Sequence, residues 1–209
     1  MTKSKNRSWI KRHVDDSYVK QAQTDGYRSR ASYKLLEIVQ KDRLIRSGMT
    51  VVDLGSSPGG WSQVAARFVG ASGTVIALDI LPMSPVAGVT FLNGDFTDET
   101  VFLELMSMAK RRTIDLVISD IAPNLTGIRA VDQPAVFYLA ELALDFALKV
   151  LTFKGIFIAK LFQGQGFDSF VLDLRKRFNK VTICKPDASR PKSREVYIVA
   201  NGLKANERG

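Results

Sequence analysis

Apolar, β-branched runs alternate with helical stretches along most of this chain, and this alternation constrains the fold more than any other feature. Continuous apolar strands that alternate with helices indicate a parallel sheet covered on both faces. Two further helices are expected before the first strand, the second of them capped by Ser29. The expected strands span 50–55, 74–80, 89–95, 114–120 and 155–162, and the expected helices span 17–23, 29–42, 61–69, 99–110, 134–151 and 167–178.

The end of the chain departs from this alternation. Residues 180–186 and 194–202 have the pattern of two strands joined by a short polar loop, with no helix between them. They predict a hairpin, which would make the last strand antiparallel. We therefore expect an α/β, Rossmann-like fold, in which a seven-stranded, mostly parallel sheet with an antiparallel last strand carries helices on both faces.

Charge is distributed unevenly along the chain. The formal net charge is +9; residues 1–46 carry +7, residues 175–194 carry another +7, and residues 47–174 carry −5. Two basic segments around an acidic centre favour a polyanionic partner such as a nucleic acid, with a solvated, charged surface as the alternative. Cys184 is the one cysteine, and we expect a buried, inert thiol. Neither a signal peptide nor a membrane span is expected, which favours a cytoplasmic protein.

A glycine-rich turn follows the first strand in the sequence VVDLGSSPGGW. Gly55 begins the turn, and Gly59-Gly60 opens the next helix. This spacing differs from the dinucleotide fingerprint and from the nucleotide-triphosphate loop, both of which hold phosphates. The acidic strand end at Asp53 beside a glycine turn instead suits a cofactor with a cationic amino-acid tail and no phosphate, such as S-adenosylmethionine.

Acidic residues also end the second and third strands. A carboxylate at Asp79 can accept both hydroxyls of an adenosine ribose, and Asp95 would lie within reach of the adenine amino group. A helix cap or a turn residue is the alternative for each aspartate. Trp61, beside the glycines, is compatible both with cofactor contact and with a place in the core.

The fourth and fifth strands carry candidates for chemistry. Asp120 ends the fourth strand, and Lys160 lies inside the apolar run of the fifth. A lysine balanced between burial and a nearby carboxylate can act as a base. Methylation of a ribose 2′-hydroxyl needs such a base, because the hydroxyl proton must leave while the oxygen is held in line with the methyl donor. A stabilising ion pair between Lys160 and Asp120 is the alternative.

Taken together, the motifs resemble the FtsJ/RrmJ family of bacterial 23S ribosomal RNA (uridine-2′-O-)-methyltransferases over about residues 8–202. Ser56-Ser57 and Thr126 are conservative departures from the family pattern. The resemblance implies a methyltransferase domain at 29–202, between a basic extension at 1–28 and a tail at 203–209. It is carried by SRASYKLLEI, MTVVDLGSSPGGWSQ, ALDILPM, GVTFLNGDFTDE, VISDIAPNLTG, KLFQGQGFD and SREVYIVANG.

The resemblance also implies specific site residues. The family uses a Lys-Asp-Lys-Glu tetrad with the second lysine as the principal base, and by motif the tetrad falls on Lys34, Asp120, Lys160 and Glu195. S-adenosylmethionine would be the cofactor, without a metal, and its contacts would fall on Gly59, Trp61, Asp79, Asp95 and Asp120. The implied substrate is a uridine ribose in the A loop of 23S rRNA in the large (50S) ribosomal subunit, methylated by a monomer.

RNA held by the two basic segments would lie across the catalytic lysines, although each basic side chain can equally be a solvent-facing charge. A protein that binds RNA or ribosomes on an inactive methyltransferase fold stays open as a second function. A methyltransferase that acts on a small molecule or a protein stays open as a third, and salt-insensitive substrate binding would favour it. The candidate phosphate contacts are Lys11, Arg12, Arg28, Arg30, Arg190, Lys192 and Arg194.

Overall fold

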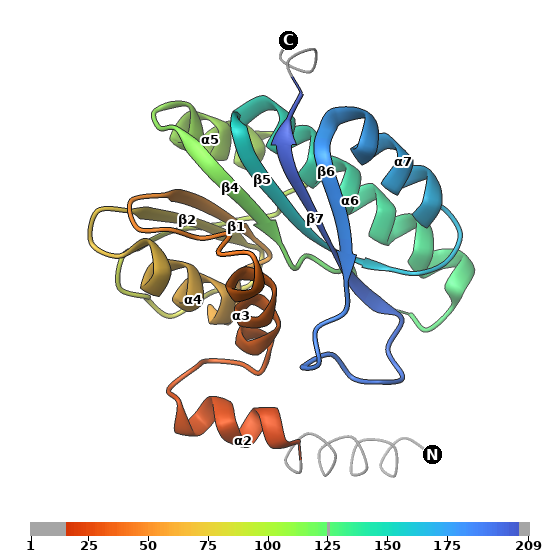
Figure 1. Ribbon diagram of the computed structural model, residues 1–209, viewed down its shortest axis with the longest axis horizontal. Helices are drawn as coiled ribbons and strands as arrows, with labels where there is room; N and C mark the ends of the chain where they lie inside the picture. The colour runs from red at the N-terminus through yellow and green to blue at the C-terminus, as the bar shows by residue number, and fades with distance from the viewer. Residues whose placement is uncertain (1–15, 125, 205–209) are drawn as a thin grey trace.

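A seven-stranded sheet forms the centre of the computed structural model, which describes residues 16–124 and 126–204 (Figure 1). The strand order is β3-β2-β1-β4-β5-β7-β6, and all neighbouring pairs are parallel except those that β7 makes with β5 and β6. The predicted mostly parallel sheet with an antiparallel last strand is therefore confirmed. The strands are β1 (Thr50–Leu54), β2 (Thr74–Asp79), β3 (Val89–Asn93), β4 (Ile114–Ser119), β5 (Leu151–Phe162), β6 (Phe178–Cys184) and β7 (Glu195–Leu203).

Helices cover both faces of the sheet, as the sequence predicts. On one face, α3 and α4 pack against the strands in one apolar cluster, and on the other α5, α6 and α7 form a second cluster. β1 supplies residues to both, with Val51 in the first and Val52 in the second, and both side chains are fully buried. This two-sided burial explains the continuous apolar sequence of the strand. The helices are α2 (Ser17–Thr24), α3 (Ala31–Lys41), α4 (Gly60–Val69), α5 (Glu99–Lys110), α6 (Arg129–Val150) and α7 (Phe167–Arg177).

The glycine-rich turn after β1 passes close to the end of β4. Gly55 has φ +77°, and a Cβ there would lie 2.8 Å from the backbone nitrogen of Ile121. Only glycine fits this position, because both the left-handed backbone and the close approach exclude a side chain. The turn therefore brings the carboxyl ends of β1 and β4 together, where ligands bind in open α/β sheets.

Helix α6 begins five residues earlier than the sequence predicts. The carboxylate of Asp132 accepts the backbone N–H groups of Thr126 at 2.7 Å and Gly127 at 2.9 Å, which folds the preceding loop onto the first turn of the helix. Pro134 thus lies inside α6, whereas the sequence analysis placed it at the helix start. The proline was a poor guide to the boundary because the loop contacts that begin the helix involve residues on both sides of it.

Three other local expectations need correction. Ser29 does not cap α3, whose N-cap is Arg30 with no side-chain cap. β7 continues to Leu203, which is almost fully buried, so the first residue of the expected tail belongs to the sheet. Cys184 is half-buried rather than buried, because it lies on the outer strand β6; burial still raises the pKa of its thiol.

Candidate active site

Lys160 and Asp120 meet at the carboxyl edge of the sheet. The Lys160 Nζ lies 2.6 Å from the backbone oxygen of Asp120 and 3.1 Å from its carboxylate Oδ1. The Lys160 side chain is only 9% exposed and that of Asp120 is 20% exposed. The Lys160 side chain is therefore paired inside the protein, yet both side chains keep some exposure to solvent. The geometry is compatible with both roles that the sequence allows, a stabilising ion pair and a base.

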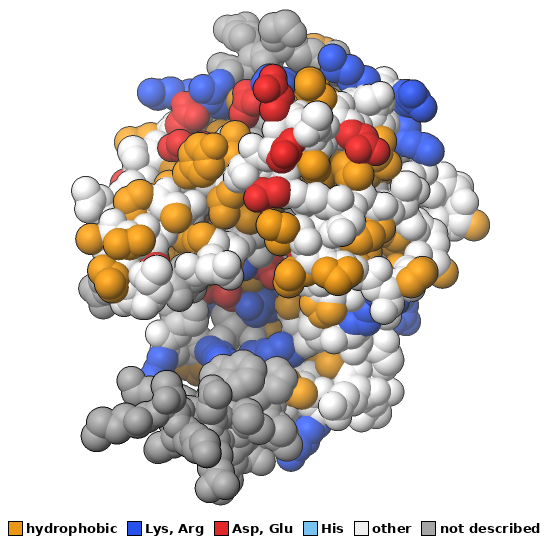
Figure 2. All heavy atoms as spheres, turned by 180° about the vertical axis from the view of Figure 1, so that it is seen from behind, with side chains coloured by type: hydrophobic (Ala, Val, Ile, Leu, Met, Phe, Trp, Pro, Cys, Tyr) orange, Lys and Arg blue, Asp and Glu red, His pale blue; other side chains and the backbone are white. Residues whose placement is uncertain are grey.

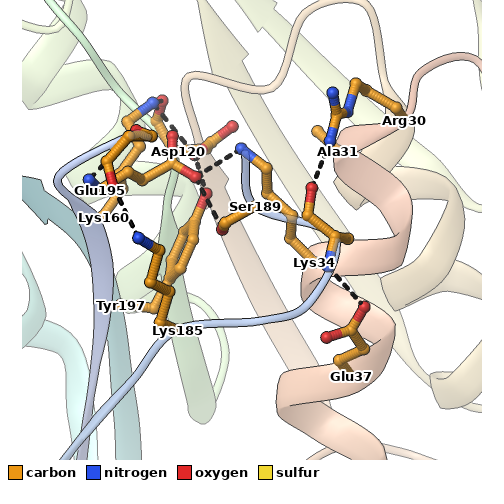
Figure 3. Close-up of polar contacts among 12 residues, drawn as sticks. Arg30, Ala31, Lys34, Glu37, Asp120, Lys160, Lys185, Ser189, Glu195 and Tyr197 are labelled. Atoms are coloured by element: carbon orange, nitrogen blue, oxygen red, sulfur yellow. Dashed lines mark hydrogen bonds and ion pairs between the residues drawn. The ribbon is translucent and has the colours of Figure 1, made fainter. Parts of the chain in front are cut away.

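A second lysine–carboxylate pair lies beside the first. The Lys34 Nζ, from α3, is 2.6 Å from Oε1 of Glu195 at the start of β7, and Ser189 Oγ donates to the same oxygen at 3.1 Å. Figure 3 shows the side chains of both pairs converging on one region. The structure thus brings together Lys34, Asp120, Lys160 and Glu195, which are far apart in the sequence.

Tyr197 connects the two pairs, and the sequence analysis missed it. Its hydroxyl donates to Asp120 Oδ1 at 3.1 Å, and its ring lies 5.8 Å from the Lys34 ammonium (Figure 3). Tyr197 is also the cross-strand neighbour of Lys160 in the β5–β7 ladder. Two signals could have revealed it: a buried tyrosine hydroxyl needs a partner, and residues two apart on a strand, here Glu195 and Tyr197, share a face.

Burial and neighbouring charges set the protonation of this cluster. Burial raises the pKa of Tyr197 well above its usual value, and the charges of Asp120 and Glu195 raise it further, so the phenol stays a donor. Burial also acts to raise the pKa of Glu195, but the charge and hydrogen bond of Lys34, with the charge of Lys160 and the Ser189 bond, together hold the pKa below its usual value. Within the cluster, these two pKa shifts favour the ionised carboxylate of Glu195 and the neutral phenol of Tyr197.

Contacts between α3 and the β6–β7 loop hold this cluster together. The Glu37 carboxylate accepts the backbone N–H groups of Asp187 at 2.6 Å and Ala188 at 3.0 Å. Arg30 donates to the carbonyl of Ala188 and pairs with Asp16, the N-cap of α2. These bonds fix the helix that carries one lysine of the cluster against the loop that leads into Glu195.

Four acidic residues lie along the carboxyl edge in the order of the strands. Asp95 follows β3, Asp79 ends β2, Asp53 lies near the end of β1 and Asp120 follows β4. The predicted cofactor acids are thus on adjacent strands, beside the lysine–carboxylate cluster. An elongated cofactor could contact all of them along one edge.

Two buried polar atoms beside the glycine-rich turn have no partner within the described residues. They are Asp53 Oδ1 and Ser56 Oγ; the other Asp53 oxygen accepts a hydrogen bond from Ser62 at 2.6 Å. Burial, together with the charges of Asp120 and Asp79, raises the pKa of Asp53 to about 7, against the lowering effect of the Ser62 bond. Unpaired buried acceptors are costly, and the cationic amino-acid tail of S-adenosylmethionine fits an environment of this kind.

The other predicted cofactor residues have protein partners. Asp79 accepts the backbone N–H groups of Ser57 and Leu81, both at 2.8 Å, and so shapes the turn. Trp61 is 3% exposed in the core, and its indole N–H donates to the Ala31 carbonyl at 2.8 Å.

Gly59 begins α4 with φ +106°. Asp95 is exposed, and its Oδ1 accepts both the backbone N–H and the hydroxyl of Thr97. The cap and turn roles that were the alternative for the aspartates are therefore present; cofactor contact remains a prediction for all four residues, Gly59, Trp61, Asp79 and Asp95.

Arg28, a candidate phosphate contact, binds the glycine-rich turn. Its guanidinium donates to the carbonyl oxygens of Pro58 at 3.1 Å, Ser84 at 2.5 Å and Pro85 at 2.5 Å. It thereby links the turn after β1 to the loop after β2. Charge alone could not separate this role from RNA contact, because the partners are backbone atoms far away in the sequence.

The basic candidates of the β6–β7 loop lie next to residues of the site, since Arg190 follows Ser189 and Arg194 precedes Glu195. Figure 2 shows a recess on one face of the molecule with Lys and Arg side chains in and around it. Arg190 and Lys192 are exposed in the β6–β7 loop, and exposed Arg194 donates to the Gln163 carbonyl at 3.2 Å. Lys11 and Arg12 lie outside the described residues. The β6–β7 loop therefore offers the most accessible positive charge next to the cluster.

Residues 16–124 and 126–204 hold neither a cluster of metal ligands nor a membrane-spanning helix. These residues contain no group of three or more histidine, cysteine, aspartate or glutamate side chains arranged to hold a metal ion. None of their helices is both long and apolar enough to cross a membrane.

Comparisons with known proteins agree on one family. The FtsJ-like methyltransferase family matches residues 27–203. A protein of Marinobacter nauticus named ribosomal RNA large subunit methyltransferase E is 59% identical over 203 residues, which cover 97% of this chain and 98% of the relative. A protein of the same name from Cellvibrio japonicus is 58% identical over 202 residues, covering 97% and 95% of the two chains.

A solved structure also resembles this fold. The crystal structure of a ribosomal RNA methyltransferase from Plasmodium falciparum superimposes with a TM-score of 0.75 at 27% identity. The match covers 85% of this chain and 98% of the other.

Proposed function

Because this chain belongs to the FtsJ-like methyltransferase family, we propose that it methylates the 2′-hydroxyl of a uridine in the A loop of 23S rRNA, with S-adenosylmethionine as the methyl donor. The names of its relatives, ribosomal RNA large subunit methyltransferase E, support the large ribosomal subunit as the substrate. One observation carries the proposal: two lysine–carboxylate pairs, joined by Tyr197, lie beside the glycine-rich turn at the carboxyl edge of the sheet.

The acidic edge would hold the cofactor. Asp53, with its unpaired Oδ1, would accept the ammonium group, and Asp79 and Asp95 would bind the ribose and the adenine; the position of these acids at the ends of adjacent strands supports this. Gly59 keeps the turn open, and Trp61 supports the helix that follows it. When bound, S-adenosylmethionine supplies a methyl group that its sulfonium has already activated.

Lys160 would act as the base. In its amine form it accepts the proton of the 2′-hydroxyl, and Asp120 fixes its position through two oxygens, at 2.6 and 3.1 Å. Tyr197 orients Asp120 from the opposite strand. Lys34 and Glu195, paired at 2.6 Å, would position the ribose. Because the methyl donor is activated, alignment of the oxygen supplies much of the rate acceleration.

The test is transfer of tritium from labelled S-adenosylmethionine into large subunits that lack the modification. Lys160→Ala is expected to lower transfer by at least a hundredfold, the usual contribution of a positioned base being about 10²–10⁴, while calorimetry still detects cofactor binding. Lys149→Ala is the control, because Lys149 is an exposed lysine of α6 whose contacts, with Asp145 one helical turn away and with the Phe102 ring, lie outside the cluster. Full activity of Lys160→Ala would disprove its role, and no transfer by the wild type would disprove the proposed function.

A further inference from the structure

Two adjoining cavities lie beside the cluster, on the side away from the cofactor acids. The larger has a volume of about 730 Å³ and lies between the first half of α6 and the β5–α7 loop; the smaller has about 270 Å³. Gln133 and Arg194 line both, so the two form a continuous hollow. Its total size is within the range of small-molecule sites.

Aromatic side chains line one side of the hollow, and two glycines line the other. Phe137 lines the larger cavity and Phe162 the smaller. Gly164 and Gly166 form the other side, and a Cβ on Gly164 would lie 2.4 Å from the Gln133 amide nitrogen. Glycine at these positions makes room for the Gln133 amide and the Phe137 ring, which a Cβ on Gly164 or Gly166 would crowd.

Polar groups in the hollow suit the edge of a nucleobase. The Gln133 amide carries both donors and an acceptor, and only a long bond of 3.4 Å, to the Phe162 carbonyl, restrains it. Arg194 holds one guanidinium nitrogen 3.2 Å from the Gln163 carbonyl and is otherwise exposed. An arginine plane beside aromatic rings can stack on a base and reach its phosphate.

The charges of the hollow are arranged along its length. Lys192 lines only the smaller cavity, Glu141 lines only the larger, and Arg194 lines both. Asp132 also lines the smaller cavity, but its two oxygens already accept bonds from Thr126 and Gly127. The end of the hollow nearest the cluster is therefore the more positive one. This suits the phosphate of an RNA chain that runs from the cluster into the hollow.

The hollow is close enough to the cluster for one RNA chain to occupy both. Phe162 lies two strand residues beyond Lys160, about 7 Å along β5, and faces Glu195 in the β5–β7 ladder. Arg194 directly precedes Glu195. Asp53, Asp79 and Asp95 lie on or next to β1, β2 and β3, on the other side of β4, so the hollow is separate from these three cofactor acids.

We propose that this hollow binds an unpaired base of the substrate RNA, one that is a near neighbour of the methylated nucleotide. The inference rests on the proposed function and adds a specificity site to it. A base stacked against aromatic and arginine side chains and bonded at its edge is the usual way in which proteins read single-stranded RNA. The site would favour a loop whose bases are splayed out over one in a regular helix.

Kinetics provide the first test. Gln133→Ala is expected to raise the KM for unmodified large subunits roughly tenfold, as loss of contacts to one base would, while kcat and the cofactor affinity stay at the wild-type values. The control is Gln40→Ala, which removes an exposed glutamine from the last turn of α3. An unchanged KM for Gln133→Ala would overturn the inference, and it would leave the proposed function intact because methyl transfer would continue.

Crosslinking provides the second test. Gln165 is exposed and lines the larger cavity, so Gln165→p-benzoylphenylalanine places a photoreactive group at its rim. Irradiation with large subunits is expected to join it to one nucleotide within a few positions of the methylated one, mapped by reverse-transcription stops. The same group at Arg175, near the opposite edge of the sheet, should not label that nucleotide. Crosslinks to a ribosomal protein, to no RNA, or to the nucleotides that the control labels would overturn the inference.

Discussion

Replacement of Tyr197 by phenylalanine removes one oxygen atom from the site and so measures the contribution of that hydroxyl alone. The ring keeps its place against Trp61, 5.6 Å away, and against the Lys34 ammonium, so packing is preserved. What is lost is the hydrogen bond from the buried hydroxyl to Asp120 Oδ1. A bond to a charged group contributes about 1.5–3 kcal/mol, and we expect the lower end because Lys160 still contacts the same oxygen.

The expected loss can be measured in two ways. About 1.5 kcal/mol corresponds to a fall in Tm of about 3–6 °C for a chain of this size, measurable by calorimetry. If Tyr197 positions Asp120 and Lys160, kcat for tritium transfer falls about tenfold, with the KM for the cofactor unchanged. A merely structural tyrosine would lower Tm without this selective effect on kcat.

The control for this experiment is Tyr138→Phe, which removes the same atom from a side chain that is 54% exposed on α6. It should change neither Tm nor kcat. If Tyr197→Phe unfolded at the wild-type temperature and turned over at the wild-type rate, the hydroxyl would not connect the two pairs, and the reasoning would be refuted.

Three further outcomes are expected. Asp53, whose pKa burial raises to about 7, contributes stability that is fully present below its unfolded pKa of about 3.9 and is lost as the pH rises through about 7. Between pH 5 and pH 8, the free energy of unfolding of Asp53→Asn in urea should therefore rise by about 3 kcal/mol relative to that of the wild type. Parallel pH profiles of the two proteins would contradict this. Arg28→Ala should weaken S-adenosylmethionine binding about tenfold in calorimetry, because it frees the glycine-rich turn. If the variant instead changed the salt dependence of RNA binding, Arg28 would be a phosphate contact, as the sequence predicted. Joint replacement of Arg190 and Lys192 by alanine should reduce the slope of log K for RNA against log salt by about 2, whereas Arg175→Ala should leave it unchanged.

The sequence predicted the layers and the strands well where burial is symmetrical. β1, β2 and β4 are buried on both faces, so their apolar runs are continuous and bounded by turn residues. Boundaries failed where distant or loop contacts decide them. The start of α6 depends on Asp132 binding back to Thr126 and Gly127, and no periodic pattern carries that information.

Individual roles were harder to predict than positions. The sequence placed Arg28 and Arg190 in the same class of basic residues, yet one donates to three backbone carbonyls and the other is exposed. Tyr197 lies in the apolar run VYIVA, where a tyrosine is expected to be a residue of the hydrophobic core. Its hydroxyl became informative only when the β5–β7 register set it opposite Lys160. Partners across elements are tertiary facts, and composition or spacing does not encode them.

The antiparallel direction of β7 explains why the cluster can form at all. In a sheet of parallel strands, the residue that begins a strand lies at the edge opposite to the ligand site. β7 runs the other way, so its first residue, Glu195, pairs with Phe162 at the end of β5, and Tyr197 pairs with Lys160. The same reversal puts the β6–β7 loop, with Arg190 and Lys192, at the carboxyl edge, because β6 runs parallel to β5 and ends there. One reversed strand thus delivers the carboxylate, the phenol and the basic loop to the edge where the glycine-rich turn and Asp120 already lie, which a seventh parallel strand could not do.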